Sequence, residues 1–143
     1  MSAAPRGDDA PASSPFLDVP AANWIASNEL AVAFPDANPA SPGHTLIVPR
    51  RVVASWFQTT SEEQIAVLEL MATVKQHLDG RFHPDGYNIG FNDGEAAGQT
   101  IFHLHLHVIP RYRGDMTDPR GRIRHAVAGH GYYPATPGPR ERA

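Results

Sequence analysis

The stretch Phe-His-Leu-His-Leu-His-Val-Ile, residues 102–109, carries a histidine at every second position between apolar residues. In a β-strand, residues i, i+2 and i+4 point to the same face. We therefore expect His103, His105 and His107 to share one face of a sheet, while the leucines and the valine between them point into a core. Each imidazole has two ring nitrogens that need partners when buried, so three in a row favour a functional site over a packing role.

Two kinds of chemistry use such a row. A His-x-His pair on a strand is a familiar zinc arrangement, but the outer histidines would lie ~13 Å apart, so one ion could take only two of the three. His44 is the obvious further donor, because no acidic residue or cysteine lies between Phe102 and Arg113. Alternatively, a neutral imidazole can attack a phosphate while its neighbours hold its tautomer and donate hydrogen bonds. This use needs all three histidines, so we predict phosphoryl or nucleotidyl transfer without a metal.

Outward from this stretch, the apolar patterns predict the remaining elements. We expect strands at residues 24–27, 30–34, 44–48, 87–91 and 101–109, with a turn at 28–29 and Pro49 ending the third strand or placing it at an edge. One helix is expected at residues 59–78. This order predicts an α+β domain with a mostly antiparallel five-stranded sheet and one main helix.

The helix carries its own start and stop signals. Thr60 and Glu63 can form a capping box, and Gly80 is the expected stop. A stripe of apolar residues should pack on the sheet, and further apolar residues should widen it. The stripe is Val67, Met71, Val74 and Leu78, and the widening residues are Ile65, Leu68 and Ala72.

Composition narrows the class of protein. The 143 residues suffice for one domain, and the absence of cysteine excludes disulfides, thiolate zinc sites and cysteine nucleophiles. No apolar run approaches the ~18 residues of a membrane span, and Met1 to Pro15 lacks the apolar segment of a secretory signal. We expect a soluble cytoplasmic protein with no membrane partner.

Charge is distributed unevenly along the chain. The net charge is −3, but the segment from Arg111 onward has seven arginines against three acidic residues, so it carries +4 and the remainder −7. An acidic body argues against nucleic acid as the main partner. We divide the chain into a disordered leader at 1–15, a catalytic domain at 16–112 and a basic extension at 113–143. The extension is either a solvated tail or a surface for a polyphosphate.

A glycine-containing loop, residues 94–100, precedes the histidine row. It has no lysine and leads into a strand rather than a helix, so it is not a P-loop. Its backbone N–H groups could still hold an anion.

Two blocks resemble the histidine triad (HIT) family. Ala-Gly-Gln-Thr-Ile-Phe-His-Leu-His-Leu-His-Val-Ile-Pro-Arg, residues 97–111, is similar to the family signature of three histidines alternating with apolar residues. Pro-Gly-His-Thr-Leu-Ile-Val-Pro, residues 42–49, resembles a second family block. The resemblance covers roughly Phe16 to Arg111, and it implies a HIT-like fold that forms a two-fold homodimer.

The resemblance also implies roles for the histidines. His105 would be the nucleophile that forms a nucleotidyl-histidine intermediate, which water then hydrolyses. His103 would orient His105, His107 would contact the phosphate, and His44 would support the triad from the neighbouring strand. A histidine at position 107 resembles the hydrolases of the family, whereas its uridylyltransferases carry glutamine there.

Substrate contacts follow from the same resemblance. Asp36 falls where family members hold the ribose hydroxyls, although an aspartate beside Pro35 can also simply form a turn. Asn92, Gln99 and Thr100 fall where the family contacts phosphate or leaving group, with a turn as the alternative for Asn92. The remaining histidines, His77, His83, His125 and His130, are expected at the surface.

We therefore predict a hydrolase or transferase acting at the α-phosphate of a dinucleoside polyphosphate or a nucleoside phosphoramidate. Its partner would be a small-molecule nucleotide. It would require no cofactor, although a divalent cation can accompany a polyphosphate. Two alternatives stay open: a metal-dependent hydrolase using the same histidines, and a nucleotide-binding regulatory module without catalysis.

Overall fold

The computed structural model describes residues 13–128 and 130–131 and contains one five-stranded sheet and one long helix. The strands are β1 (Ala26–Ser27), β2 (Ala31–Pro35), β3 (Thr45–Pro49), β4 (Gly86–Gly90) and β5 (Leu106–Arg111), and α1 (Ser61–Phe82) lies between β3 and β4 in sequence. Short 3-10 helices are η2 (Pro15–Asp18), η3 (Ala21–Asn23), η4 (Trp56–Gln58), η5 (Glu95–Ala97) and η6 (Arg122–Ala126).

The strand order is β1-β2-β3-β5-β4, and every neighbouring pair is antiparallel. The predicted α+β class with an antiparallel sheet is thus confirmed. The expected hairpin between β1 and β2 also forms, because Asn28 Oδ1 accepts hydrogen bonds from the backbone N–H groups of Leu30 and Ala31. In the middle of the sheet, His107 pairs with Leu46 on one side and Gly90 on the other.

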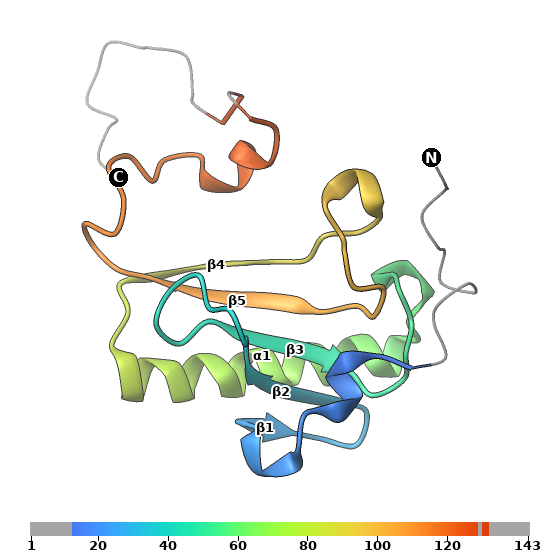
Figure 1. The fold of residues 1–143 in the computed structure, drawn as a ribbon. Coiled ribbons are helices and arrows are strands. Elements are labelled where there is room, and N and C mark those ends of the chain that lie inside the picture. Colours follow the sequence, from blue (N-terminus) through green and yellow to red (C-terminus); the bar gives the residue numbers. More distant parts are fainter. Residues whose placement is uncertain (1–12, 129, 132–143) are drawn as a thin grey trace.

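The two faces of the sheet are covered differently (Figure 1). Helix α1 packs on one face, where Ile47, Leu106 and Val108 join its buried side chains in the main core. On the other face the N-terminal segment covers β2 and β3, and a second cluster forms around Phe34 and Leu46. The part of this second face that lies over β5 and β4 is left for the histidines, because His107, Ile109 and Arg111 alternate with the core residues of β5.

The histidine strand begins later than predicted. We expected a strand from Ile101 to Ile109, but β5 begins at Leu106, and neither His103 nor His105 belongs to it. The ladder with β3 stops because Pro49 has no N–H to donate, while the N–H of Leu104 donates to the carbonyl of Val53 at 2.7 Å. The expected inward direction of Leu104, Leu106 and Val108 is confirmed, since all three are buried.

The predicted start of helix α1 is confirmed, whereas its predicted end is wrong. Thr60 is the N-cap, and both bonds of the capping box with Glu63 are present. The helix runs through Gly80 to Phe82, and the residue in the left-handed conformation is His83, with φ 52°. Gly80 was therefore the wrong stop.

The core-facing side of α1 is also narrower than predicted. Its buried apolar residues are Ala66, Val67, Leu70, Val74 and Leu78. Ile65, Leu68 and Ala72, which we expected to widen this face, are exposed, because they lie on the flank of the helix that turns away from the sheet.

The predicted boundary between the leader and the folded domain also needs correction. Residues 1–12 lie outside the described part of the chain, but Ser14 is buried and caps η2, which begins at Pro15. The folded domain therefore begins before Phe16. Of the basic extension, the described residues contain only η6 as regular structure. Within the described residues, no helix combines the length and the apolar character needed to cross a membrane.

The end of α1 yields a stability prediction. His83→Gly should raise the free energy of unfolding by about 1 kcal/mol, because glycine adopts the left-handed conformation without the steric cost of a Cβ atom. The matched control is His77→Gly in the exposed interior of the same helix, which should lower it by about 0.5 kcal/mol. Urea unfolding of both variants measures the two shifts, and a loss of stability in His83→Gly would contradict the assigned helix end.

Candidate functional site

The three histidines of the row occupy different environments. His103 is fully buried, whereas His105 and His107 are half-buried on the second face of the sheet. The His105 and His107 rings meet edge to face with centroids 5.1 Å apart. Phe16 contacts both His103 and His105, at 5.5 and 5.0 Å between centroids. The row therefore consists of one interior histidine and two that line an open surface.

His103 is held by partners on both ring nitrogens. Its Nε2 lies 2.7 Å from the carbonyl oxygen of Pro49, which can only accept, so Nε2 carries the proton. Its Nδ1 lies 2.7 Å from Ser14 Oγ and therefore accepts from that hydroxyl. Both nitrogens are satisfied, which explains how a histidine can be fully buried here.

His105 has its tautomer fixed by the backbone of His103. Its Nδ1 lies 2.8 Å from the carbonyl oxygen of His103, so Nδ1 is the donor. In the neutral ring the lone pair is then on Nε2. A neutral imidazole with one nitrogen pinned as a donor and the other carrying its lone pair is arranged for nucleophilic attack.

His107 has the opposite tautomer, and His44 sets it. The N–H of Ala40 donates to His44 Nδ1 at 2.9 Å, so the proton of neutral His44 lies on Nε2. That nitrogen lies 2.9 Å from His107 Nδ1 and donates to it. His107 therefore carries its own proton on Nε2 and can donate it to an anionic oxygen.

The loop before β3 positions His44. Gly43 has φ +91°, and a Cβ atom there would lie 3.0 Å from Phe82 and 3.2 Å from Pro110. Only glycine fits this turn without strain. Ser41 Oγ donates to the carbonyl of Pro110 at 2.6 Å, which ties the loop to β5.

Asp36 lies in the same loop, and its carboxylate has two contacts among the described residues. Its Oδ1 accepts from the N–H of Asn38 at 2.8 Å, which is the turn that we weighed as the alternative to ribose binding. Its Oδ2 lies 3.4 Å from His44 Nε2. The structure thus brings Asp36, His44 and His107 together.

Burial keeps the supporting histidines neutral. Desolvation is the main cause that lowers the pKa of His44 and of His103. The pKa of His107 falls to about 4, first through desolvation and then through repulsion by His105 and His44. Near neutral pH these three rings therefore act as fixed donors and acceptors without charge.

A metal ion does not fit the Asp36–His44–His107 cluster, although its ligand atoms lie within 4.8 Å of one another. A neutral histidine that binds a metal through Nε2 carries its proton on Nδ1 and usually donates it to an acceptor. Here the N–H of Ala40 already points at His44 Nδ1. Coordination by His44 would set two N–H groups against each other, which opposes a metal ion at this cluster.

The predicted loop residues lie between β4 and β5. Asn92 and Thr100 are exposed, whereas Gln99 is buried. The Gln99 amide donates to the carbonyls of Ala54 and Ile101, and its oxygen accepts from the N–H of Gly94. Gln99 therefore braces the loop, and a direct substrate contact would require these bonds to break.

Sequence reasoning missed Ser14, Phe16 and Ala40. Ser14 was assigned to the leader, Phe16 was treated only as the start of the domain, and Ala40 contributes a backbone group. A Ser-Pro step before an aromatic residue is a 3-10 or helix start signal that could have moved the boundary. No pattern in the sequence pairs Ser14 with His103, 89 residues away.

The low pKa values predict how stability responds to pH. The unfolded chain takes up protons on these histidines near pH 6.5, whereas folded His107 resists protonation down to about pH 4. The unfolded state therefore binds more protons in this window, and the free energy of unfolding should fall as pH is lowered through it. His107→Asn should make this fall shallower in urea titrations at pH 7 and pH 5. The exposed control His77→Asn should leave it as in the parent, and a parent-like fall in His107→Asn would refute the assignment.

The hydrogen bond between Ser14 and His103 predicts that removing one hydroxyl group near the N-terminus lowers the stability of the fold. Ser14→Ala removes the hydroxyl and leaves a buried ring nitrogen unpaired, so the free energy of unfolding should drop by about 1–3 kcal/mol. Ser13→Ala, at the exposed neighbouring position, is the matched control and should change it by less than about 0.5 kcal/mol. Equal stability of the two variants would show that the bond contributes nothing.

Comparisons with known proteins show which family the chain resembles. Residues 19–114 match the HIT domain. The uncharacterized HIT-like protein MG132 of Mycoplasma genitalium is 40% identical over 88 residues, covering 62% of this chain and 62% of that protein. The bis(5'-nucleosyl)-tetraphosphatase (asymmetrical) of Schizosaccharomyces pombe is 36% identical over 90 residues, covering 63% of this chain and 50% of that enzyme. The chain thus spans less than two thirds of these curated relatives.

A solved structure agrees with the sequence relatives. The zinc-bound histidine triad family protein from Mycobacterium smegmatis has a TM-score of 0.60 and 36% sequence identity, covering 74% of this chain and 80% of that one. The HIT domain match spans more than half of the sequence and includes the histidine row and the loop that orients it. The chain therefore belongs to the histidine triad (HIT) family.

Proposed function

We propose that this protein is a nucleotide hydrolase that transfers a nucleotidyl group to His105 and then to water. The observation that carries the proposal is the hydrogen bond from His105 Nδ1 to the His103 carbonyl, which leaves the lone pair on Nε2. His105 is half-buried on the open face, so this lone pair is within reach of a ligand. The HIT-family relative from Schizosaccharomyces pombe, a bis(5'-nucleosyl)-tetraphosphatase, supports a nucleotide substrate.

In the first step, His105 Nε2 attacks the α-phosphorus of the nucleotide. A nitrogen–phosphorus bond forms, and the bond from phosphorus to the leaving group breaks, with its electron pair departing on the leaving group. A polyphosphate leaves as an anion, whereas the amine of a phosphoramidate takes up a proton from solvent and leaves as ammonia. His105 becomes a positively charged phosphorylated imidazole. The His103 carbonyl stabilises this charge because its negative end already faces Nδ1–H. The His107 Nε2–H donates to a phosphate oxygen.

In the second step, water attacks the same phosphorus. The nitrogen–phosphorus bond breaks, its electron pair returns to His105 Nε2, and the proton of the water passes to solvent. The products are a nucleoside monophosphate and the free enzyme. No metal or redox cofactor takes part, although a divalent cation can neutralise a polyphosphate substrate.

The remaining roles follow the same proposal. Asp36 Oδ2 lies 3.4 Å from His44 Nε2, beside the His44–His107 pair, and would hold the ribose hydroxyls. Asn92 and Thr100, exposed in the loop before β5, would contact the phosphate or leaving group. We also propose a two-fold homodimer, with the exposed Ile65 and Leu68 of α1 contributing to its interface.

Substitution of His105 tests the covalent step. His105→Ala should reduce kcat at least about 1,000-fold with diadenosine tetraphosphate or adenosine phosphoramidate, because the group that forms the bond is lost. Nucleotide affinity, measured by calorimetry with AMP, should change little, because the ribose contact lies elsewhere. His77→Ala is the control and should retain parent activity, since His77 is exposed on α1.

Three results would contradict the proposal. Turnover of His105→Ala within a factor of ten of the parent would exclude His105 as the nucleophile. Loss of the parent's activity in EDTA with the phosphoramidate, restored by zinc, would favour a metal-dependent hydrolase. Full AMP affinity without turnover in the parent would instead indicate a regulatory binding module.

A further inference from the structure

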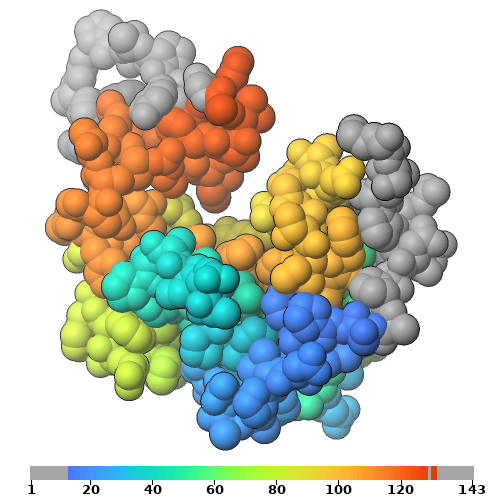
Figure 2. Space-filling view, viewed as in Figure 1, coloured from blue at the N-terminus to red at the C-terminus, as the bar shows by residue number. Residues whose placement is uncertain are grey.

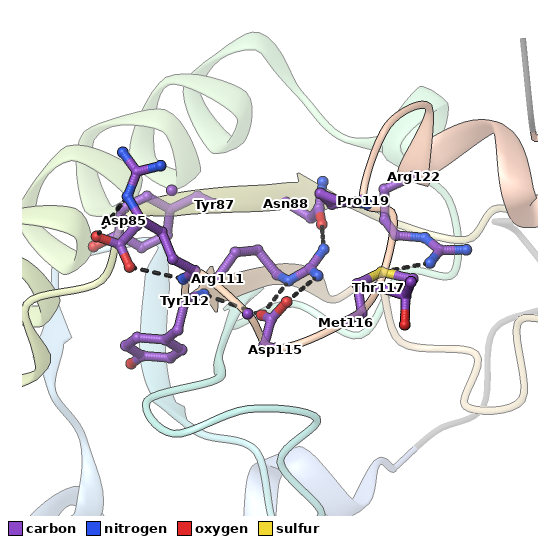
Figure 3. Close-up of a pocket in the computed structure, with 13 residues that line it drawn as sticks. Asp85, Tyr87, Asn88, Arg111, Tyr112, Asp115, Met116, Thr117, Pro119 and Arg122 are labelled. Carbon is purple, nitrogen blue, oxygen red and sulfur yellow. Dashed lines mark hydrogen bonds and ion pairs between the residues drawn. The ribbon is translucent and has the colours of Figure 1, made fainter. Parts of the chain in front are cut away.

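The basic extension is tied to the end of the sheet rather than solvated along its whole length. Arg111, the last residue of β5, donates to both carboxylate oxygens of Asp115 at 2.8 and 2.6 Å and to Asn88 Oδ1 at 2.6 Å (Figure 3). The N–H of Arg113 donates to Asp85 Oδ2 at 2.8 Å. These bonds turn the chain immediately after the strand and hold the start of the extension over one end of β4 and β5.

The extension also contacts the loop that orients His44. The Tyr112 hydroxyl donates to the carbonyl of Pro42 at 2.7 Å. Between this loop, β5 and the extension lies a pocket of about 370 Å³, lined by Ala40, Ser41, Ile109, Arg111, Asp115 and Arg122 among others. Figure 2 shows the start of the extension, in orange, beside the loop before β3, in teal.

This pocket lies further along β5 from His107, where Ile109 and Arg111 line it. Ile109 is two residues from His107 on the same face of β5, ~7 Å along the strand. Ala40, on the opposite wall, is the residue whose N–H fixes His44. A ligand group that continues from a phosphate at His107 along β5 therefore enters the pocket.

Arg122 gives the pocket a positive charge that has no carboxylate partner among residues 13–128 and 130–131. Asp115 pairs with Arg111, and Asp85 lies 3.8 Å from Arg113 Nε. Among the described residues, the hydrogen bond found for the Arg122 guanidinium goes to Met116 Sδ, and a thioether is a weak acceptor. Arg122 also lines a neighbouring hollow of about 550 Å³, which shares Arg111 and Asp115 with the pocket.

We propose that this pocket binds the phosphate chain of the leaving group and that Arg122 is its anion contact. This inference rests on the proposed function and specifies its substrate class. A dinucleoside polyphosphate carries further phosphates beyond the reacting one and fills the pocket, whereas a phosphoramidate ends before it. An arginine suits the task because its planar guanidinium donates two parallel hydrogen bonds to phosphate oxygens. A phosphate also replaces the weak thioether acceptor of Met116 at little cost. Arg122 lies outside residues 19–114, so the HIT domain itself does not supply this contact.

The test compares two substrates in single-residue variants. Arg122→Ala should lower kcat/KM for diadenosine tetraphosphate about tenfold and for adenosine phosphoramidate less than about twofold, the value of one charge-assisted hydrogen bond. Arg122→Lys should recover part of the loss, and the loss should shrink as salt rises. Arg81→Ala, an exposed position on α1, is the control and should leave both values unchanged. Deleting the extension is less specific, because loss of Asp115 would also release Arg111.

A binding measurement separates this inference from the hydrolase proposal. Inorganic tripolyphosphate should bind the His105→Ala protein, and adding Arg122→Ala should weaken that binding about tenfold. This result would stand even if His105 proved not to be the nucleophile. Unchanged tripolyphosphate affinity, or equal losses on the two substrates, would overturn the inference.

Discussion

The hydrogen bond from His105 Nδ1 to the carbonyl oxygen of His103 is the interaction on which the rest of the site depends. It works only if that carbonyl is immobile, and burial of the His103 ring provides this. Ser14 and Pro49 satisfy the two ring nitrogens, and Phe16 covers the ring. The N-terminal segment therefore supports His105 in two ways, through His103 and directly, because Phe16 also contacts the His105 ring.

Backbone groups determine the protonation pattern of the other histidines in the same way. A carbonyl makes His105 a donor at Nδ1, and an N–H from Ala40 makes His44 an acceptor at Nδ1. The result is one ring with a free lone pair beside another with a free N–H, as nucleophilic attack on a phosphate requires. The same N–H opposes a metal ion at the Asp36–His44–His107 cluster, because it already occupies His44 Nδ1. Burial adds to the effect, because desolvation keeps the supporting rings neutral.

Prediction from sequence succeeded for features that depend only on residues close together in the chain. The capping box of Thr60 and Glu63 and the Asn28 turn depend on neighbours a few residues away, and both form. The failures have a common origin. Gly80 had the right residue type for a helix end, but tertiary packing of Leu78 and Phe82 carries the helix one turn further. The alternation from Ile101 onward fits a strand, yet its partner β3 ends at a proline that cannot continue the ladder.

For the candidate site, the sequence by itself determined which residue types are available near β5, but the expectation that all three histidines share one face was wrong for His103, which is buried. The histidine row, the Pro-Gly-His block and the absence of cysteine restricted the chemistry to imidazole and carboxylate groups. Only the tertiary structure decided that His103 is interior, that Ser14 holds it, and that Arg122 lines a pocket further along β5 from His107. The physical reason is that hydrogen-bond direction and burial depend on residues far apart in the chain. A pattern of neighbouring residues identifies possible hydrogen-bond donors and acceptors, but the fold determines which partner each of them contacts.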